Sequence, residues 1–159
     1  MFARAVRFNP LKLSQIRFSS YKLTTSAIPF THSSSPIVKF TKEHEWVAIH
    51  SDGTSFIGIT SHAADALGDV TFVELPEELG EIAQGETVGS IESVKSASDV
   101  YSPIQGELVE VNSNLDEDPA LINSDPMGEG WIVKVKLEGE GSDLMSEEEY
   151  VNFLKEEEH

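Results

Sequence analysis

The segment Gly89-Ser90-Ile91-Glu92-Ser93-Val94-Lys95-Ser96-Ala97-Ser98-Asp99-Val100 sets the expectation for the fold. Strand-forming residues on both sides enclose a tip of small and polar residues, which is the pattern of a β-hairpin. Lys95 lies at this tip and is the only Lys or Arg between Glu43 and Ile132. We expect its amine to project into solvent from a tight β-connection. On this pattern alone, an ordinary solvated surface lysine is an equally valid interpretation.

Cysteine is absent from all 159 residues, which excludes disulfides, thiolate catalysis and Cys-type zinc sites. Any thiol chemistry must therefore come from an attached cofactor. The length is that of one small domain with an extension.

Charge is distributed unevenly along the chain, whose net charge is −17. Residues 1–42 contain seven basic residues and no acidic one, whereas the remainder contains all 28 acidic residues and four basic ones. Such an acidic domain repels nucleic acid and anionic membrane surfaces, so we expect neither as a partner.

The first 35 residues have the composition of a mitochondrial transit peptide, being rich in Arg, Lys, Ser and Thr. They contain no apolar run long enough for a secretory signal or a membrane span. A basic tail that binds a partner is the alternative. Residues 33–36, Ser-Ser-Ser-Pro, are typical of a linker. We therefore divide the chain into a transit peptide and linker, residues 1–35, and a domain, residues 36–159.

Short strands separated by turns dominate the rest of the chain, which predicts a mainly β fold of the small barrel or sandwich kind. A short helix over 61–67 is indicated by Thr60 as its cap and Gly68 as its end. A capping box at 146–149 begins a C-terminal helix. Strands are predicted over 46–50, 56–59, 69–75, 107–111 and 131–137, with loop over 112–117 and a helical turn over 118–122.

No arrangement of residues indicates catalysis. The five His are scattered along the chain, and no metalloprotease or phosphate-loop motif is present. Acidic residues are so numerous that a pair of carboxylates has no diagnostic value. We therefore expect neither an enzyme nor a metal site.

Several motifs together indicate a family. Beyond Glu-Ser-Val-Lys at 92–95, they are Lys-Glu-His-Glu-Trp-Val at 42–47, Gly-Ile-Thr at 58–60, Ala-Leu-Gly-Asp at 66–69, Val-Glu-Leu-Pro at 73–76, Ser-Pro-Ile-Gln-Gly at 102–106 and Gly-Trp at 130–131. In this order, over residues 40–154, the set resembles the glycine cleavage H-protein family of lipoyl carriers. The resemblance implies a lipoyl/biotinyl-type barrel-sandwich hybrid with a short internal helix and a C-terminal helix.

The resemblance also implies a function. Lys95 would receive lipoate from lipoyl-attaching enzymes, and the lipoylated side chain would form a flexible arm. The protein would act as a non-catalytic shuttle in the mitochondrial matrix. The arm would carry an aminomethyl group from glycine decarboxylase (P protein) to a tetrahydrofolate-dependent aminomethyltransferase (T protein), in glycine catabolism and one-carbon metabolism. Electrons would pass to dihydrolipoamide dehydrogenase (L protein).

The family match further suggests a groove for the loaded arm. An ammonium on the arm would meet a carboxylate, and the matching positions are Glu45 and Asp99, with His62 nearby. In the alternative interpretation, the two acids are solvated surface groups and His62 only starts a helix. Departures from the family pattern are Glu43, where a small hydroxyl residue is common, and Ser96, where Ala is usual.

Two other kinds of carrier and one non-carrier are alternatives to this family. A lipoyl domain serving 2-oxo-acid dehydrogenases typically has Asp-Lys-Ala at the tip, whereas Val94-Lys95-Ser96 stands here. A biotin carrier normally has methionines beside its lysine, and none is adjacent here. A lipoyl-relay or structural protein is the third alternative. The sequence leaves open the cleavage site, the oligomeric state and the lipoylation state.

Overall fold

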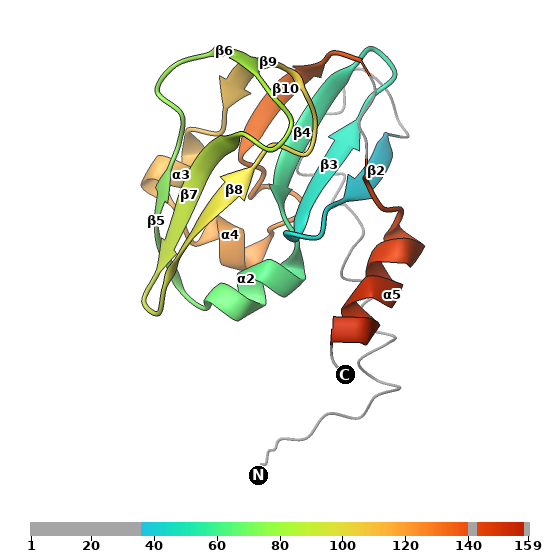
Figure 1. The fold of residues 1–159 in the computed structure, drawn as a ribbon. Coiled ribbons are helices and arrows are strands. Elements are labelled where there is room, and N and C mark those ends of the chain that lie inside the picture. Colours follow the sequence, from blue (N-terminus) through green and yellow to red (C-terminus); the bar gives the residue numbers. More distant parts are fainter. Residues whose placement is uncertain (1–35, 140–142, 158–159) are drawn as a thin grey trace.

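The structure is a computed structural model that describes residues 36–139 and 143–157. The predicted transit peptide, residues 1–35, lies outside the described residues. Two antiparallel sheets and four short helices make up the described part of the chain (Figure 1). The predicted mainly β class, with an internal and a C-terminal helix, is confirmed.

The larger sheet has six strands in the order β2-β3-β4-β10-β9-β6. Hairpins join β2 to β3 and β3 to β4, and β10 lies between β4 and β9. The bounds of these strands are Ile37–Phe40 for β2, Glu45–Ile49 for β3, Thr54–Ile59 for β4, Val133–Leu137 for β10, Gly106–Val111 for β9 and Gly80–Ile82 for β6.

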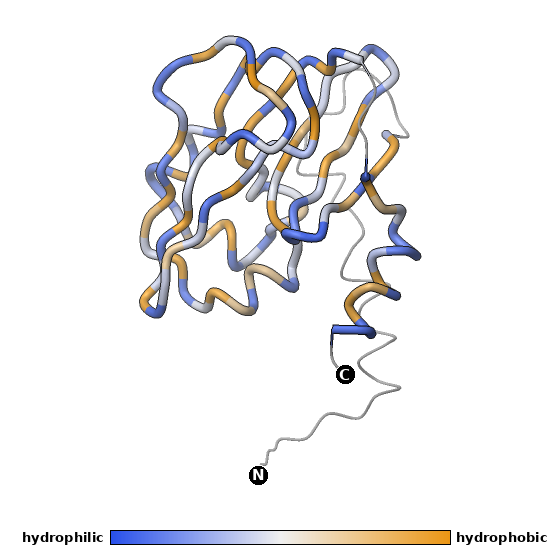
Figure 2. Tube along the Cα trace, in the orientation of Figure 1, coloured by the Kyte–Doolittle hydropathy of each residue, from blue (hydrophilic) through white to orange (hydrophobic). Residues whose placement is uncertain are grey.

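The smaller sheet carries the lysine hairpin and has the order β5-β7-β8. Its strands are β5 (Val70–Glu74), β7 (Thr87–Ser93) and β8 (Ala97–Tyr101). Aliphatic side chains from both sheets form one core, which includes Val47, Ile57, Val73, Ile91 and Val133. Figure 2 shows hydrophobic residues interspersed along the strands of both sheets, as half-buried strands require.

Helix α2, Ser61–Leu67, follows β4 and begins and ends where the sequence predicts. The Thr60 side chain accepts a hydrogen bond from the Ala63 N–H at 3.3 Å. Gly68 ends the helix with φ +78° and ψ −155°, a backbone conformation that is essentially restricted to glycine.

Two further short helices, α3 (Asn114–Glu117) and α4 (Leu121–Ser124), connect β9 to β10. The predicted loop over 112–117 is wrong, because Leu115 is fully buried and fixes a helical turn there. Strand β6 is absent from the strands that the sequence predicts. Its three residues pair only with β9 and carry no alternating pattern of their own.

The C-terminal helix α5, Glu147–Glu157, packs beside β2 on a second, aromatic core (Figure 1). Tyr150 stacks on Phe40 with ring centroids 4.8 Å apart, and both side chains are fully buried. The predicted capping box is present: the Glu149 N–H donates to Ser146 Oγ, and the Ser146 N–H donates to Glu149 Oε1. None of the helices in the described ranges has the length and apolar character needed to cross a membrane.

Candidate functional site

The tip of the β7–β8 hairpin is held by backbone and serine hydrogen bonds. Glu92 lies opposite Ala97 in the ladder, and the Ser93 N–H donates to the Ser96 carbonyl at 2.8 Å. The Ser93 hydroxyl oxygen accepts from the backbone N–H groups of Lys95 and Ser96 at 3.2 and 3.1 Å. The tip is also tied to the loop after α2, because the Val94 N–H donates to the Asp69 carbonyl. The backbone around Lys95 is therefore fixed, and its side chain is exposed.

The Lys95 side chain leans over Gly68. A Cβ atom at Gly68 would lie 3.0 Å from Lys95 Cε, which is tighter than ordinary packing, and 3.5 Å from Nζ, which is an ordinary contact distance. The absent side chain leaves room for the lysine stem beside the end of α2. The Gly68 backbone is fixed in turn by Asn123 Nδ2, which donates to its carbonyl at 2.8 Å.

A groove of about 340 Å³ begins beside Lys95 and runs between β8 and α2 toward the start of β3. Its walls combine apolar side chains with polar and charged ones. The three acidic or basic side chains that the sequence singled out as groove residues, Glu45, His62 and Asp99, all line it. The apolar lining residues are Ile59, Ala63, Ala66, Leu67, Ile91, Ala97 and Val100.

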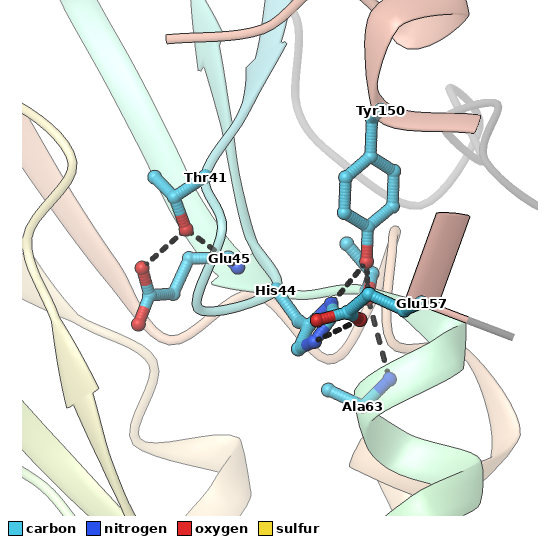
Figure 3. A network of polar contacts seen from close by, with 7 residues as sticks. Thr41, His44, Glu45, Ala63, Tyr150 and Glu157 are labelled. Atoms are coloured by element: carbon cyan, nitrogen blue, oxygen red, sulfur yellow. Dashed lines mark hydrogen bonds and ion pairs between the residues drawn. The ribbon is translucent and has the colours of Figure 1, made fainter. Parts of the chain in front are cut away.

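Glu45 is buried at the inner end of this groove and joins the two sheets. Thr41 Oγ1 donates to Glu45 Oε1 at 2.6 Å (Figure 3). The Tyr101 N–H donates to Glu45 Oε2 at 3.1 Å. Burial raises the pKa of the Glu45 carboxyl, and the hydrogen bonds from Thr41 and Tyr101 lower it in part. Glu45 thus has a structural role that sequence reasoning did not assign: it anchors β8 to the turn before β3.

Asp99 is placed differently, on the outer strand β8, opposite Ser90 of β7. It is exposed, whereas Glu45 is only 2% exposed. A cationic group in the groove can therefore approach Asp99 from solvent without displacing an internal hydrogen bond.

Sequence reasoning missed His44 as a neighbour of His62. The two imidazole rings lie with centroids 4.6 Å apart. His44 Nδ1 is 2.8 Å from the Tyr150 hydroxyl oxygen (Figure 3). His44 Nε2 lies 3.7 Å from Glu157 Oε1. Burial lowers the pKa of His44, as does the adjacent His62, while Glu157 and Glu43 raise it. No spacing rule connects these positions, because α5 brings Tyr150 and Glu157 to His44 from the far end of the chain.

Comparison with known proteins points to one family. The family model described as Glycine cleavage H-protein matches residues 38–157. The chain belongs to the glycine cleavage H-protein family. A mitochondrial glycine cleavage system H protein of Saccharomyces cerevisiae is 53% identical over 144 residues, covering 86% of this chain and 84% of the relative. The Thermotoga maritima H protein is 53% identical over 121 residues, covering 75% of this chain and 97% of the relative.

A solved structure agrees with the sequence relatives. The crystal structure of a glycine cleavage system H protein from Mycobacterium marinum superposes with a TM-score of 0.70 at 39% identity. The match covers 74% of this chain and 96% of that one. The predicted family and lipoyl-carrier fold are therefore confirmed.

Membership of the glycine cleavage H-protein family establishes the role of the chain. It is a lipoyl carrier of the glycine cleavage system, it works with the enzymes of that system, and it is not itself a catalytic enzyme. Its cofactor is a lipoate attached covalently to a lysine. The alternative of a lipoyl domain serving 2-oxo-acid dehydrogenases is not favoured.

The described residues fit such a cofactor. Lys95 is exposed at the hairpin tip, and within the described ranges no hydrogen bond or ion pair engages its amine. By contrast, Lys134 Nζ is 2.7 Å from Glu110 Oε1, and Lys136 Nζ donates to the Asp52 carbonyl. The apolar residues that line the groove beside Lys95 suit the hydrocarbon chain of a lipoyl group.

Proposed function

We propose that Lys95 is the lysine that carries lipoate in this glycine cleavage system carrier. The observation that supports this assignment is the groove, which begins at Ser96, directly after the lysine, and leads to Glu45. When bound, the lipoyl group would supply a redox-active disulfide and an attachment point for the aminomethyl group. The chain supplies a fixed backbone below a free side chain, which lets a tethered group reach several active sites at a raised effective concentration.

The partners we propose are glycine decarboxylase (P protein), the tetrahydrofolate-dependent aminomethyltransferase (T protein), dihydrolipoamide dehydrogenase (L protein) and the lipoyl-attaching enzymes. Family membership supports this set as the enzymes of one system. We place the carrier in the mitochondrial matrix and assign residues 1–35 as a transit peptide and linker ahead of the domain at 36–159. The basic, acid-free composition of that segment and the mitochondrial S. cerevisiae relative support this assignment.

A lipoylation assay tests the lysine assignment. The full chain is incubated with lipoate ligase, ATP and lipoate, and the site is mapped by peptide mass spectrometry. Wild-type protein and the matched control Lys134→Arg should gain one lipoyl group on Lys95, and Lys95→Arg should gain none. Arg keeps the charge of Lys95 but not its reactive primary amine. Lipoate found on Lys134, Lys136 or Lys155 of the wild-type chain would overturn the assignment.

Groove residues are proposed to retain a cationic cargo on the arm. Asp99 on β8 offers an accessible carboxylate and Glu45 on β3 a buried one, and His62 lines the groove from α2. A hydrogen bond to a charged group is worth roughly 1.5–3 kcal/mol, or about tenfold to a hundredfold in population. Asp99→Asn tests this role without disturbing the fold, because Asp99 is exposed on its strand.

The measurement is spontaneous formaldehyde release from isolated, loaded carrier. We expect faster release from Asp99→Asn than from wild type, and normal reduction and reoxidation of the unloaded arm. Glu45→Gln should also release faster, but it weakens the link from Thr41 to Tyr101, so its thermal stability must be measured in parallel. Equal release from all three proteins would mean that the apolar walls alone retain the cargo.

A further inference from the structure

Three potential metal ligands converge at the edge of the groove, which His44 and His62 line, and each comes from a different part of the chain. His44 precedes β3, His62 lies in the first turn of α2, and Glu157 ends α5. One ligand atom from each lies within 4.8 Å of the other two. Sequence reasoning predicted no metal site, because positions 44, 62 and 157 share no ligand spacing.

We propose that His44, His62 and Glu157 form a binding site for a divalent ion of the zinc class. Around a tetrahedral zinc ion with bonds of about 2.0–2.1 Å, neighbouring ligand atoms lie about 3.3 Å apart. His44 Nε2 and Glu157 Oε1 are already 3.7 Å apart. Small side-chain rotations would therefore bring all three atoms to bonding distance of one ion. Glu157 can rotate in this way because it is exposed, in the last turn of α5.

The surroundings of His44 resemble the outer shell of a metal-bound imidazole. A ligating His nearly always donates its second ring N–H to another group, which fixes the ring and directs the remaining nitrogen at the metal. Here His44 Nδ1 is 2.8 Å from the Tyr150 hydroxyl, which is itself 2.8 Å from Thr60 Oγ1. Tyr150 is fully buried, so this partner is held in place. His44 Nε2 then faces His62 and Glu157.

The ligand set selects the kind of ion. Two imidazole nitrogens and one carboxylate suit Zn²⁺, Co²⁺ or Ni²⁺, and the same His-His-Glu set with an open fourth position occurs in zinc enzymes. Mg²⁺ and Ca²⁺ require mostly oxygen ligands. The cluster contains a single carboxylate, which disfavours both of those ions.

Occupancy of this site would affect the groove. His62 lines the groove, and Glu157 lies at the end of α5, so one ion would fasten α5 to α2 beside the proposed arm path. The proposal does not depend on the identity of the lipoylated lysine.

Zinc titration of the full-length chain tests the proposal. Metal-free protein competes with a chromophoric chelator for Zn²⁺, and far-UV circular dichroism confirms that every variant is folded. We expect one equivalent of Zn²⁺ on wild type and a rise in its melting temperature on binding. His62→Ala and Glu157→Gln should each weaken binding at least about tenfold, since even outer-shell changes cost about 10–100-fold.

Two control variants keep the test specific. Glu156→Gln removes the neighbouring carboxylate of α5 and should leave zinc affinity unchanged. His159→Ala removes the terminal imidazole of the chain and should also leave it unchanged. Absence of stoichiometric binding, or a loss of affinity in His159→Ala with none in His62→Ala, would overturn the proposal.

Discussion

The lysine hairpin and the C-terminal helix lie on two sides of the molecule (Figure 1) and are built by different means. The hairpin tip is exposed, and apart from the bond from the Val94 N–H to the Asp69 carbonyl, the hydrogen bonds that shape it join residues no more than three positions apart. Helix α5 is held by Tyr150, whose hydroxyl contacts residues 90 and 106 positions away. Mostly local contacts thus present the reactive amine, while long-range contacts bring together His44, His62 and Glu157. The tip should therefore tolerate change that α5 does not.

Truncating the central residue on each side should give the largest contrast. Tyr150→Ala removes a fully buried ring stacked on Phe40. Truncating a buried aromatic residue to Ala typically lowers the free energy of unfolding by about 3–5 kcal/mol. Val94→Ala truncates a side chain that is 71% exposed, and we expect a change within about 0.5 kcal/mol. Urea unfolding of both variants measures the difference. Similar losses would show that the tip is part of the cooperative core.

A smaller effect is expected at Gly68, which a long-range hydrogen bond from Asn123 holds against the Lys95 side chain. Gly68→Ala places a side chain on a backbone that is essentially glycine-only, which costs about 1–3 kcal/mol. The new Cβ would also press on the Lys95 stem, 3.0 Å away. We expect lower stability together with slower lipoylation. Gly85→Ala is the matched control, because φ is also positive there but nothing lies within 4 Å of the added carbon. An equal lipoylation rate in the two variants would argue against steric support of the lysine.

Within the tip itself, Ser93 carries most of the local order. Ser93→Ala removes the hydroxyl that accepts from two backbone N–H groups, both of which remain open to water. The free energy of unfolding should fall by an amount at the low end of about 0.5–1.5 kcal/mol, the net contribution of one hydrogen bond. Amide hydrogen exchange of residues 94–96 should speed up while exchange in α5 stays unchanged. Faster exchange in α5 as well would mean that the two sides are coupled.

The same division explains what could be predicted from the sequence. The hairpin around Lys95, the Thr60 cap of α2 and the Ser146–Glu149 capping box all depend on residues within a few positions of one another. Each was placed correctly, because local hydrogen bonding and turn geometry are encoded in short stretches.

The contacts that could not be predicted cross the fold. Nothing in the sequence pairs His44 with Tyr150, or assigns Glu45 to the Tyr101 N–H. These contacts exist because sheet pairing and aromatic packing bring distant segments together. Family resemblance located Glu45, Asp99 and His62 on one groove, but their roles there remain proposals.

The smallest effect concerns the charge at the start of α5. Glu149 accepts a hydrogen bond from the Ser146 N–H, and these contacts with Ser146 lower the pKa of its carboxyl below the usual value; Lys39 on β2 lowers it further. Glu147 and Glu148 are the neighbouring acids on α5. Because the pKa is lower in the folded chain than in the unfolded one, the ionised carboxylate stabilises the fold above the unfolded value. This stabilisation is lost as pH falls through the folded pKa.

The expected result is therefore a gap between wild type and Glu149→Gln that is present at neutral pH and closes on acidification. Gln can still accept from the Ser146 N–H, so the neutral-pH difference should be small, and it isolates the charge from the capping geometry. Melting temperatures of both proteins, measured at closely spaced pH values from neutral to about pH 3, test this prediction. Glu148→Gln, at an exposed neighbouring position, is the control. A gap that widens on acidification would contradict the assigned sign. Amide hydrogen exchange at the Lys95 tip should be the same in wild type and Glu149→Gln. A difference there would contradict the independence of the hairpin and α5.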